Sequence, residues 1–211
     1  MTRPLTLLTL LPLPGVAQAQ AVGDHYELRS RVLLAIGTPQ ELAAGKGKRE
    51  SQELSFLLEV ERVLPDGRVS GTITQGEQRT RYTGQLSNAI WQVIPRLLQP
   101  LELELSSGSR GARKTQLEVA GRQIEVSLEA TPSKGRRGEL KIAGQGSHLI
   151  KEQGVTLAVD LKGRLLTKEG ADRLDLRVKW SASGGPGQPA ESRLGLRVSI
   201  RKLAAGEGVS K

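Results

Sequence analysis

Residues 173–180 read RLDLRVKW, and this short stretch decides the fold. Its leucines, valine and tryptophan alternate with charged residues, which is the period of a β-strand with one face in the core and one in water. Residues 193–201, RLGLRVSIR, repeat the pattern with arginine at the polar positions. Both stretches therefore predict strands of an antiparallel sheet with one solvated face.

The same alternation recurs along most of the chain. Pro65-Asp66-Gly67 and Gly121-Arg122 supply turn residues between apolar stretches, because proline presets φ and glycine accepts positive φ. We expect a mainly β protein, a large antiparallel meander of about eleven strands. To protect its edges, the meander must curl into a barrel, a half-barrel or a sandwich. The expected strands lie near residues 26–36, 54–60, 69–73, 80–82, 101–105, 117–119, 124–128, 140–150, 155–161, 174–180 and 194–200.

One segment, residues 88–99, breaks the alternation. Trp91, Ile94 and Leu98 fall on a helical stripe there, which predicts one short helix. Pro95 would kink or shorten that helix, so an irregular turn is expected beside it. If the curled sheet encloses an apolar ligand, these three side chains are candidates for a lid across its mouth.

The start of the chain is typical of an export signal. Arg3 precedes a short leucine-rich run, and Ala17-Gln18-Ala19 ends in the small-x-small pattern that signal peptidase accepts. The run is shorter than the roughly 20 apolar residues that span a membrane. We expect a cleavable signal peptide over residues 1–19 and a single β domain over 20–211, with a flexible tail over 204–211. The mature chain is then expected to be periplasmic or secreted, soluble and without a transmembrane segment.

The composition excludes several kinds of chemistry. The chain has no cysteine, which excludes disulfides, thiol catalysis, zinc–thiolate sites, iron–sulfur clusters and a lipid-modified cysteine anchor. Aromatic residues make up only 2% of the chain. Stacking platforms for sugars or single-stranded nucleic acid are therefore not expected, nor is specific nucleic-acid binding.

Catalytic and metal-binding patterns are scarce. His25 and His148 are the two histidines, and nothing in their spacing predicts a metal site, although Asp24 adjoins His25. Ser147 and His148 are neighbours on a strand and point to opposite faces, so they do not make a catalytic pair. The segment 144–146, GQG, is interpreted as a glycine bend in a long strand rather than a nucleotide-binding loop. We expect no cofactor and no metal.

Positive charge is concentrated in three glycine- and serine-rich loops. The chain has a formal net charge of +9, and most of this excess lies in residues 37–50, 106–114 and 131–138. In a strict up-and-down meander these loops would share one end of the sheet and form one basic rim. Such a rim could attract anionic lipid headgroups or envelope polymers. The candidate anion-binding residues are Lys46, Lys48, Arg49, Arg110, Arg113, Lys114, Lys134, Arg136 and Arg137.

Three functional interpretations remain open at this stage. The first is an exported, non-enzymatic protein of the cell envelope that acts by binding or as an assembly component. The alternative is a periplasmic carrier of an apolar ligand, such as a lipid or acyl chain. The general look is similar to the half-barrels of periplasmic lipoprotein carriers, and the chain has no motif of that family. The third is an envelope hydrolase with a carboxylate pair, because carboxylates are abundant.

Overall fold

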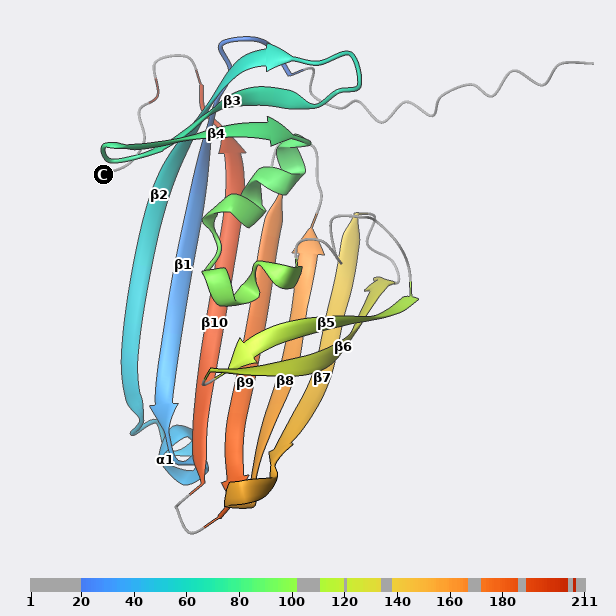
Figure 1. Cartoon of the computed structure of the whole chain (residues 1–211). Helices are drawn as coiled ribbons and strands as arrows, with labels where there is room; N and C mark the ends of the chain where they lie inside the picture. Colours follow the sequence, from blue (N-terminus) through green and yellow to red (C-terminus); the bar gives the residue numbers. More distant parts are fainter. Residues whose placement is uncertain are drawn as a thin grey trace, which may run out of the picture.

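The computed structural model describes residues 20–101, 111–119, 121–133, 138–166, 172–185, 189–204 and 207. Within these ranges ten antiparallel strands form one sheet, in the order β4-β3-β2-β1-β10-β9-β8-β7-β6-β5 (Figure 1). The strands are β1 His25–Gly37, β2 Lys48–Val63, β3 Val69–Gln75, β4 Gln78–Gly84, β5 Gly111–Val119, β6 Arg122–Pro132, β7 Glu139–Ile150, β8 Val155–Leu166, β9 Arg173–Gly184 and β10 Ala190–Lys202. The expected antiparallel β architecture is confirmed. The sheet curls without closing into a barrel, since β4 and β5 are its two edges.

Two meanders make up this sheet. Strands β1 to β4 form the first and β5 to β10 the second, and each strand pairs with its neighbours in the chain. The two meanders are joined where β1 pairs with β10 along nearly its whole length, from Tyr26 opposite Lys202 to Gly37 opposite Glu191. The first and last strands therefore lie side by side in the middle of the sheet.

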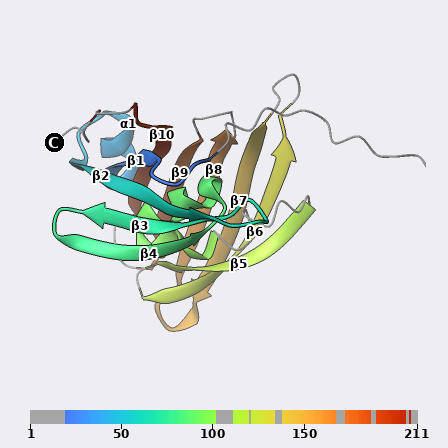
Figure 2. The same ribbon diagram turned by 90° about the horizontal axis from the view of Figure 1, so that it is seen from above.

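The curl is made at two corners where glycine allows a close backbone approach. A Cβ on Gly71 of β3 would overlap the carbonyl oxygen of Glu59, beside a shift in the β2–β3 register. A Cβ on Gly146 of β7 would overlap the carbonyl oxygen of Glu125 on β6. At these corners the hairpins β3–β4 and β5–β6 fold over the same face of the sheet (Figures 1 and 2). The predicted glycine bend at 144–146 lies within β7, at the second corner.

The segment between β4 and β5 fills the space under the two folded hairpins. It forms two short 3₁₀ helices, η1 Leu86–Val93 and η2 Arg96–Leu98, separated at Pro95. They lie on the inward face of the sheet (Figure 1), and Trp91 and Leu98 are buried in a single core with the inward side chains of the strands. The core is mostly aliphatic, as the composition predicts.

A further helix, α1 Pro39–Ala43, was not predicted. It lies between β1 and β2, where the sequence was interpreted as a glycine-rich loop. Thr38 and Glu41 form a capping box, with Pro39 in the first turn. This pattern is a known signature of a helix start, so the signal for α1 was present in the sequence. A third 3₁₀ turn, η3 Lys151–Gln153, joins β7 to β8.

The expected signal peptide, residues 1–19, lies outside the described residues, and so does most of the expected strand 101–105. In the part of the chain that is described, no helix combines the length and apolar character needed to cross a membrane. Of the expected tail, Ala204 and Glu207 are described, and Glu207 pairs with Arg201 at 2.7 Å.

Candidate anion-binding face

The outward face of the sheet is the side away from the 3₁₀ helices, turned from the viewer in Figure 1. On the five central strands β1, β10, β9, β8 and β7, the alternation places apolar side chains inward and charged side chains outward. The outward cations on these strands are Arg29, Arg31, Lys141, Lys162, Arg164, Arg173, Arg177, Lys179, Arg193, Arg197 and Arg201, and the outward acids are Glu27, Glu139, Asp160, Asp175 and Glu191. These five strands therefore carry a clear excess of positive charge on this face, while the flanking strands β2 and β6 add acids such as Glu53, opposite Arg31, and Glu129, opposite Ala143.

The acids on this face lie beneath the cations. The side chain of Glu191 is only 2% exposed, and it pairs with Lys179 at 2.7 Å and Arg193 at 2.6 Å. Both cations keep nearly half of their side chains exposed. Two further triads have the same form: Arg29–Glu27–Arg201 and Arg173–Asp175–Arg197. The triads of Glu191 and Glu27 therefore present cations to solvent above a buried acid, whereas Asp175 stays about one third exposed.

The triads keep their carboxylates ionised. Burial alone would raise the pKa of Glu191, but hydrogen bonds from Lys179 and Arg193, with their charges, outweigh it and lower this pKa. The pKa values of Glu27 and Asp175 are lowered in the same way, by flanking arginines acting against burial. A triad of two cations and one ionised acid has a net charge of +1, so the three together make the face positive.

A shallow hollow of about 860 Å³ lies in the middle of this face. Six Lys or Arg residues and two Asp or Glu residues are among those that line it. The cations are Arg31, Lys141, Lys162, Arg164, Arg177 and Arg197. They come from all five central strands, so only the pairing of strands brings them together.

The strand register sets these six cations in three opposed pairs. Arg31 lies opposite Arg197, Arg177 opposite Lys162, and Lys141 opposite Arg164. Side chains directly opposite on neighbouring strands have Cβ atoms about 4.5–5.5 Å apart, and like charges placed so destabilise a sheet. Three such pairs in one hollow are an arrangement that folding alone does not favour.

One cation of each opposed pair makes no ion pair with a described carboxylate, although Glu53 of β2 lies opposite Arg31 on its other side. Arg31, Arg177 and Lys141 make no ion pair or side-chain hydrogen bond with any residue that the structure describes. Each of the other three pairs with a carboxylate: Arg197 with Asp175, Lys162 with Asp160, and Arg164 with Glu139. The unpaired cations are thus available to an anion from outside the chain.

The floor of the hollow is apolar. Leu33 on β1 is 46% exposed although it lies in the middle of a charged face. Gly195 on β10 lies opposite it and presents no side chain. A second hollow of about 670 Å³ shares Leu33, Gly195, Arg177 and Lys162 with the first and extends to Leu42 of α1. The two hollows therefore form one groove: charged side chains line both hollows, and Leu33, Ala35 and Leu42 add an apolar floor towards α1.

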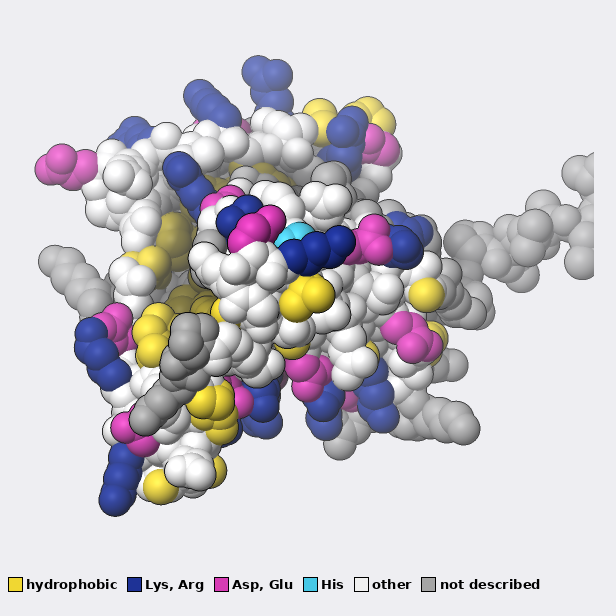
Figure 3. Space-filling model, turned by 60° about the horizontal axis from the view of Figure 1, so that its bottom comes forward, with side chains coloured by type: hydrophobic (Ala, Val, Ile, Leu, Met, Phe, Trp, Pro, Cys, Tyr) yellow, Lys and Arg dark blue, Asp and Glu magenta, His cyan; other side chains and the backbone are white. Residues whose placement is uncertain are grey.

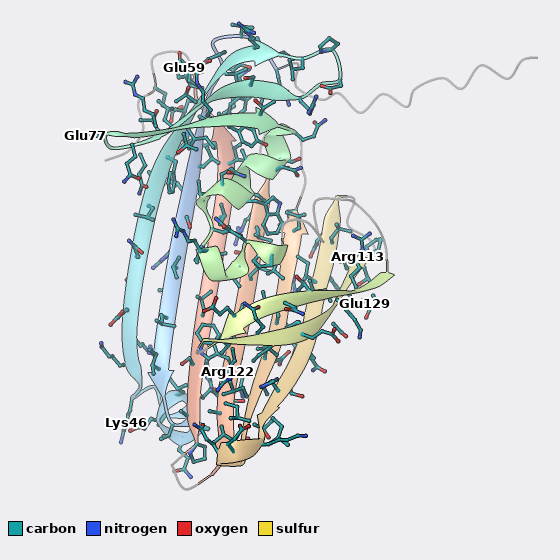
Figure 4. The ribbon with its side chains drawn as sticks, in the orientation of Figure 1. Lys46, Glu59, Glu77, Arg113, Arg122 and Glu129 are labelled. Carbon is teal, nitrogen blue, oxygen red and sulfur yellow. The ribbon has the colours of Figure 1, made fainter. Side chains whose placement is uncertain are left out.

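The described members of the predicted basic rim lie at different ends of the sheet. Lys46 and Lys48 follow the end of β1, where Lys48 pairs with exposed Glu50. Arg113 lies towards the opposite end of the sheet (Figure 4), since β5 begins opposite Ala130 near the start of β7 and β7 runs in the same direction as β1.

The remaining predicted cations lie in different parts of the chain. Arg49 lines the second hollow of the groove. Lys114 is on β5, where it pairs with Glu125 at 2.7 Å. Arg110, Lys134, Arg136 and Arg137 lie outside the described residues. Of the nine predicted residues, Arg49 is the one that the described structure brings to the groove.

The candidate lid residues are part of the core. Trp91 is 1% exposed, and Ile94 and Leu98 are also buried. The inward face is left more open beyond these helices, where Val32, Leu34 and Trp180 are only partly buried and Ile36 is exposed. Figure 3 shows a recess in which hydrophobic side chains gather, with charged side chains of both signs around it.

The histidines do not meet. His25 begins β1, whereas His148 is on β7 opposite Leu157, and other strands lie between. Asp24 is engaged by Lys202 at 2.7 Å. No group of three or more His, Asp or Glu residues in the described ranges could hold a metal ion.

Charge summed loop by loop does not reveal the cations of the groove, because these cations lie on strands. The alternation did place arginine and lysine on polar strand positions such as Arg177 and Arg197, but they were interpreted as an ordinary solvated surface. Acidic residues on other strands, such as Glu53 and Glu129, cancel their charge in any count along the chain. A count by strand face would have revealed the excess.

Comparison with known proteins identifies no relative: no protein-family model matches the chain, and a search of curated proteins finds no match.

Proposed function

We propose that the chain is an exported, non-enzymatic protein of the cell envelope that binds an anionic ligand through the outward face of its sheet. The observation that carries this proposal is the set of three opposed cation pairs around the hollow. Each pair is unfavourable in the free protein because like charges face each other. An anion between the cations converts that repulsion into attraction.

The location of the charge also supports binding. The carboxylates of Glu27 and Glu191 are held below the surface and ionised, so a ligand approaching these two triads meets cations first. A face with one sign of charge raises the local concentration of ligands with the opposite sign and speeds their encounter. In the cell envelope, the anions available to such a face include lipid headgroups and polymers. Export itself is inferred from the leader-like sequence of residues 1–19.

Matched charge variants test the proposal. The triple variant Arg31→Gln, Lys141→Gln, Arg177→Gln removes the three unpaired cations of the hollow. The control Arg79→Gln, Arg122→Gln, Lys151→Gln removes three exposed cations elsewhere; Figure 4 shows Arg122 at the β5–β6 turn. Binding to polyphosphate and to phosphatidylglycerol vesicles is measured for both at several salt concentrations.

We expect the groove triple to lose about tenfold or more in affinity at low salt, and the control to lose much less. The difference should shrink as salt increases, because salt screens exposed charges. Equal losses in the two variants would mean that net charge, not the groove, attracts anions, and would overturn the proposal.

A second candidate function is carriage of an apolar ligand on the inward face. It is favoured by the partly buried Trp180 and the exposed Ile36, which lie beyond the cover of the 3₁₀ helices. Because Trp91 is buried and Trp180 is not, an apolar ligand there should change the fluorescence of Trp180 alone. A Trp91→Phe variant leaves Trp180 as the reporter, and an unchanged spectrum with added fatty acid would count against this candidate.

A further inference from the structure

The groove on the outward face has two ends of different chemistry, and this difference defines a ligand class. The inference rests on the proposed anion-binding function and deepens it. At the first end, Arg31, Lys141 and Arg177 lack acidic partners among the described residues. At the second end, the groove runs over Leu33 and Ala35 to Leu42.

The apolar floor is formed by an exposed side chain and is not merely a space where a side chain is absent. Leu33 is nearly half exposed on a strand whose outward neighbours Arg31 and Arg29 are charged. Gly195 keeps the floor open, because a Cβ added there would meet nothing closer than the Cβ of Leu33 at 3.8 Å. The glycine is therefore not required by crowding, unlike Gly163, where a Cβ would overlap the side chain of Leu176.

Helix α1 closes the second end. It contacts β1 and β10, and its single buried side chain, Leu42, lines the groove. The capping box of Thr38 and Glu41 fixes the start of this short helix, with the backbone N–H of Glu41 donating to Thr38 Oγ1 at 3.2 Å. A chain lying over Leu33 would end against Leu42.

We propose that the groove binds a single-chain anionic amphiphile, with its phosphate or carboxylate headgroup among Arg31, Lys141 and Arg177 and its hydrocarbon chain along Leu33 and Ala35 towards Leu42. Both hollows have volumes within the roughly 300–1,000 Å³ range of small-ligand pockets. A polyanion would use the cations and has no need of an apolar floor. A flat bilayer surface would contact the cations and leave the recessed Leu33 in water.

A series of alkyl phosphates below their micelle concentrations tests this assignment, with ethyl, octyl and dodecyl chains measured by calorimetry on the full chain. The wild type should bind more tightly as the chain lengthens, roughly twofold per methylene for a half-open groove. Dodecyl maltoside, which has the chain without the charge, should bind at least tenfold more weakly than dodecyl phosphate.

Two variants locate the effect. Gly195→Leu should fold, since its Cβ has room and its φ is not positive, and the new side chain should fill the floor. It is expected to abolish the dependence on chain length while polyphosphate binding stays within about twofold. Leu33→Ser removes the floor by a different route and should weaken the same dependence.

The outcomes separate the two proposals. If polyphosphate binds but the alkyl series is flat, or if Gly195→Leu leaves the chain-length dependence unchanged, the amphiphile assignment is wrong and anion binding stands. The same holds if dodecyl maltoside binds as tightly as dodecyl phosphate. If neither polyphosphate nor any alkyl phosphate binds, the anion-binding function itself is wrong.

Discussion

Arg31 on β1 and Arg197 on β10 lie directly opposite each other on the outward face of the sheet. Asp175 pairs with Arg197 at 2.8 Å, whereas Glu53 of β2, which lies opposite Arg31 on its other side, makes no ion pair with it. Two arginines in this relationship repel each other without a ligand and attract the same anion with one. Removing one of these arginines should therefore make the free protein more stable and its anion binding weaker.

Replacing Arg31 with Gln should stabilise the free protein while it weakens anion binding. The gain is at most about 0.5 kcal/mol, because exposed like charges on neighbouring strands interact weakly. Thermal unfolding at low salt measures it, and high salt should erase it. Arg29→Gln is the matched control: Arg29 pairs with buried Glu27 at 3.0 Å, so its loss should not stabilise the protein. A lower melting temperature for Arg31→Gln would contradict the repulsion.

The triads should make stability depend on pH in the acid range. The pKa values of Glu27 and Glu191 are lowered below the ordinary value of 4.5. Between the folded and unfolded pKa values the unfolded chain binds more protons, so stability rises with pH there. The contribution is fully present above 4.5 and is lost as pH falls through the folded pKa values.

Urea unfolding between neutral pH and about pH 3 measures this dependence. The variant Glu27→Gln, Glu191→Gln should be less stable than the wild type at neutral pH and should lose less stability on acidification. Glu53→Gln, an exposed carboxylate on the outward side of β2 that belongs to none of the triads, is the control. If the free energies of unfolding of the wild type and the double variant fall in parallel as the pH decreases, the triads do not cause the loss of stability in acid.

Glycine substitutions should distinguish the corners of the curl from the groove. Gly146→Ala places a Cβ on the carbonyl oxygen of Glu125, where the backbone of β6 cannot move away without losing the corner. We expect a loss of about 1–3 kcal/mol in the free energy of unfolding. Gly195→Ala, also in a strand and with free space, should be neutral or slightly stabilising. Denaturant unfolding of the two variants measures the contrast, and similar losses in both would refute it.

Trp91 should behave as a core residue rather than a lid. Trp91→Ala removes a side chain that is 1% exposed and is expected to cost about 3–5 kcal/mol. Acrylamide quenching gives an independent check, because Trp91 should be protected and the partly buried Trp180 should be quenched. The single-tryptophan variants Trp91→Phe and Trp180→Phe assign the two signals. A variant at Trp91 that keeps full stability would return this residue to the role of a lid.

The sequence predicts local structure well and long-range structure poorly. The alternation around Leu174 and Val178 is enough to predict their strand, and Pro95 does separate two short helical segments. The pairing of β1 with β10 depends on residues at opposite ends of the domain, and no local pattern encodes it. The corner at Gly71 is likewise visible only when the backbone of Glu59 is placed beside it.

The same division explains the site. Loop charges such as Lys46 are visible directly in the sequence, and the predicted basic rim is based on them. Arg31, Arg177 and Lys141 belong to different strands, so their approach depends on strand order and register. The amphipathic period predicted which face each side chain occupies, but not which side chains share a neighbourhood.

The pairing of β1 with β10 also has a consequence for the timing of folding. Arg31 and Leu33 are made early and Gly195 and Arg197 late, so the groove cannot assemble before β10 has emerged. Until then the edge of β1 is open, and an open edge can pair with another chain. Contacts between such distant segments form slowly. The proposed binding surface therefore forms only after the last strand of the sheet has been made.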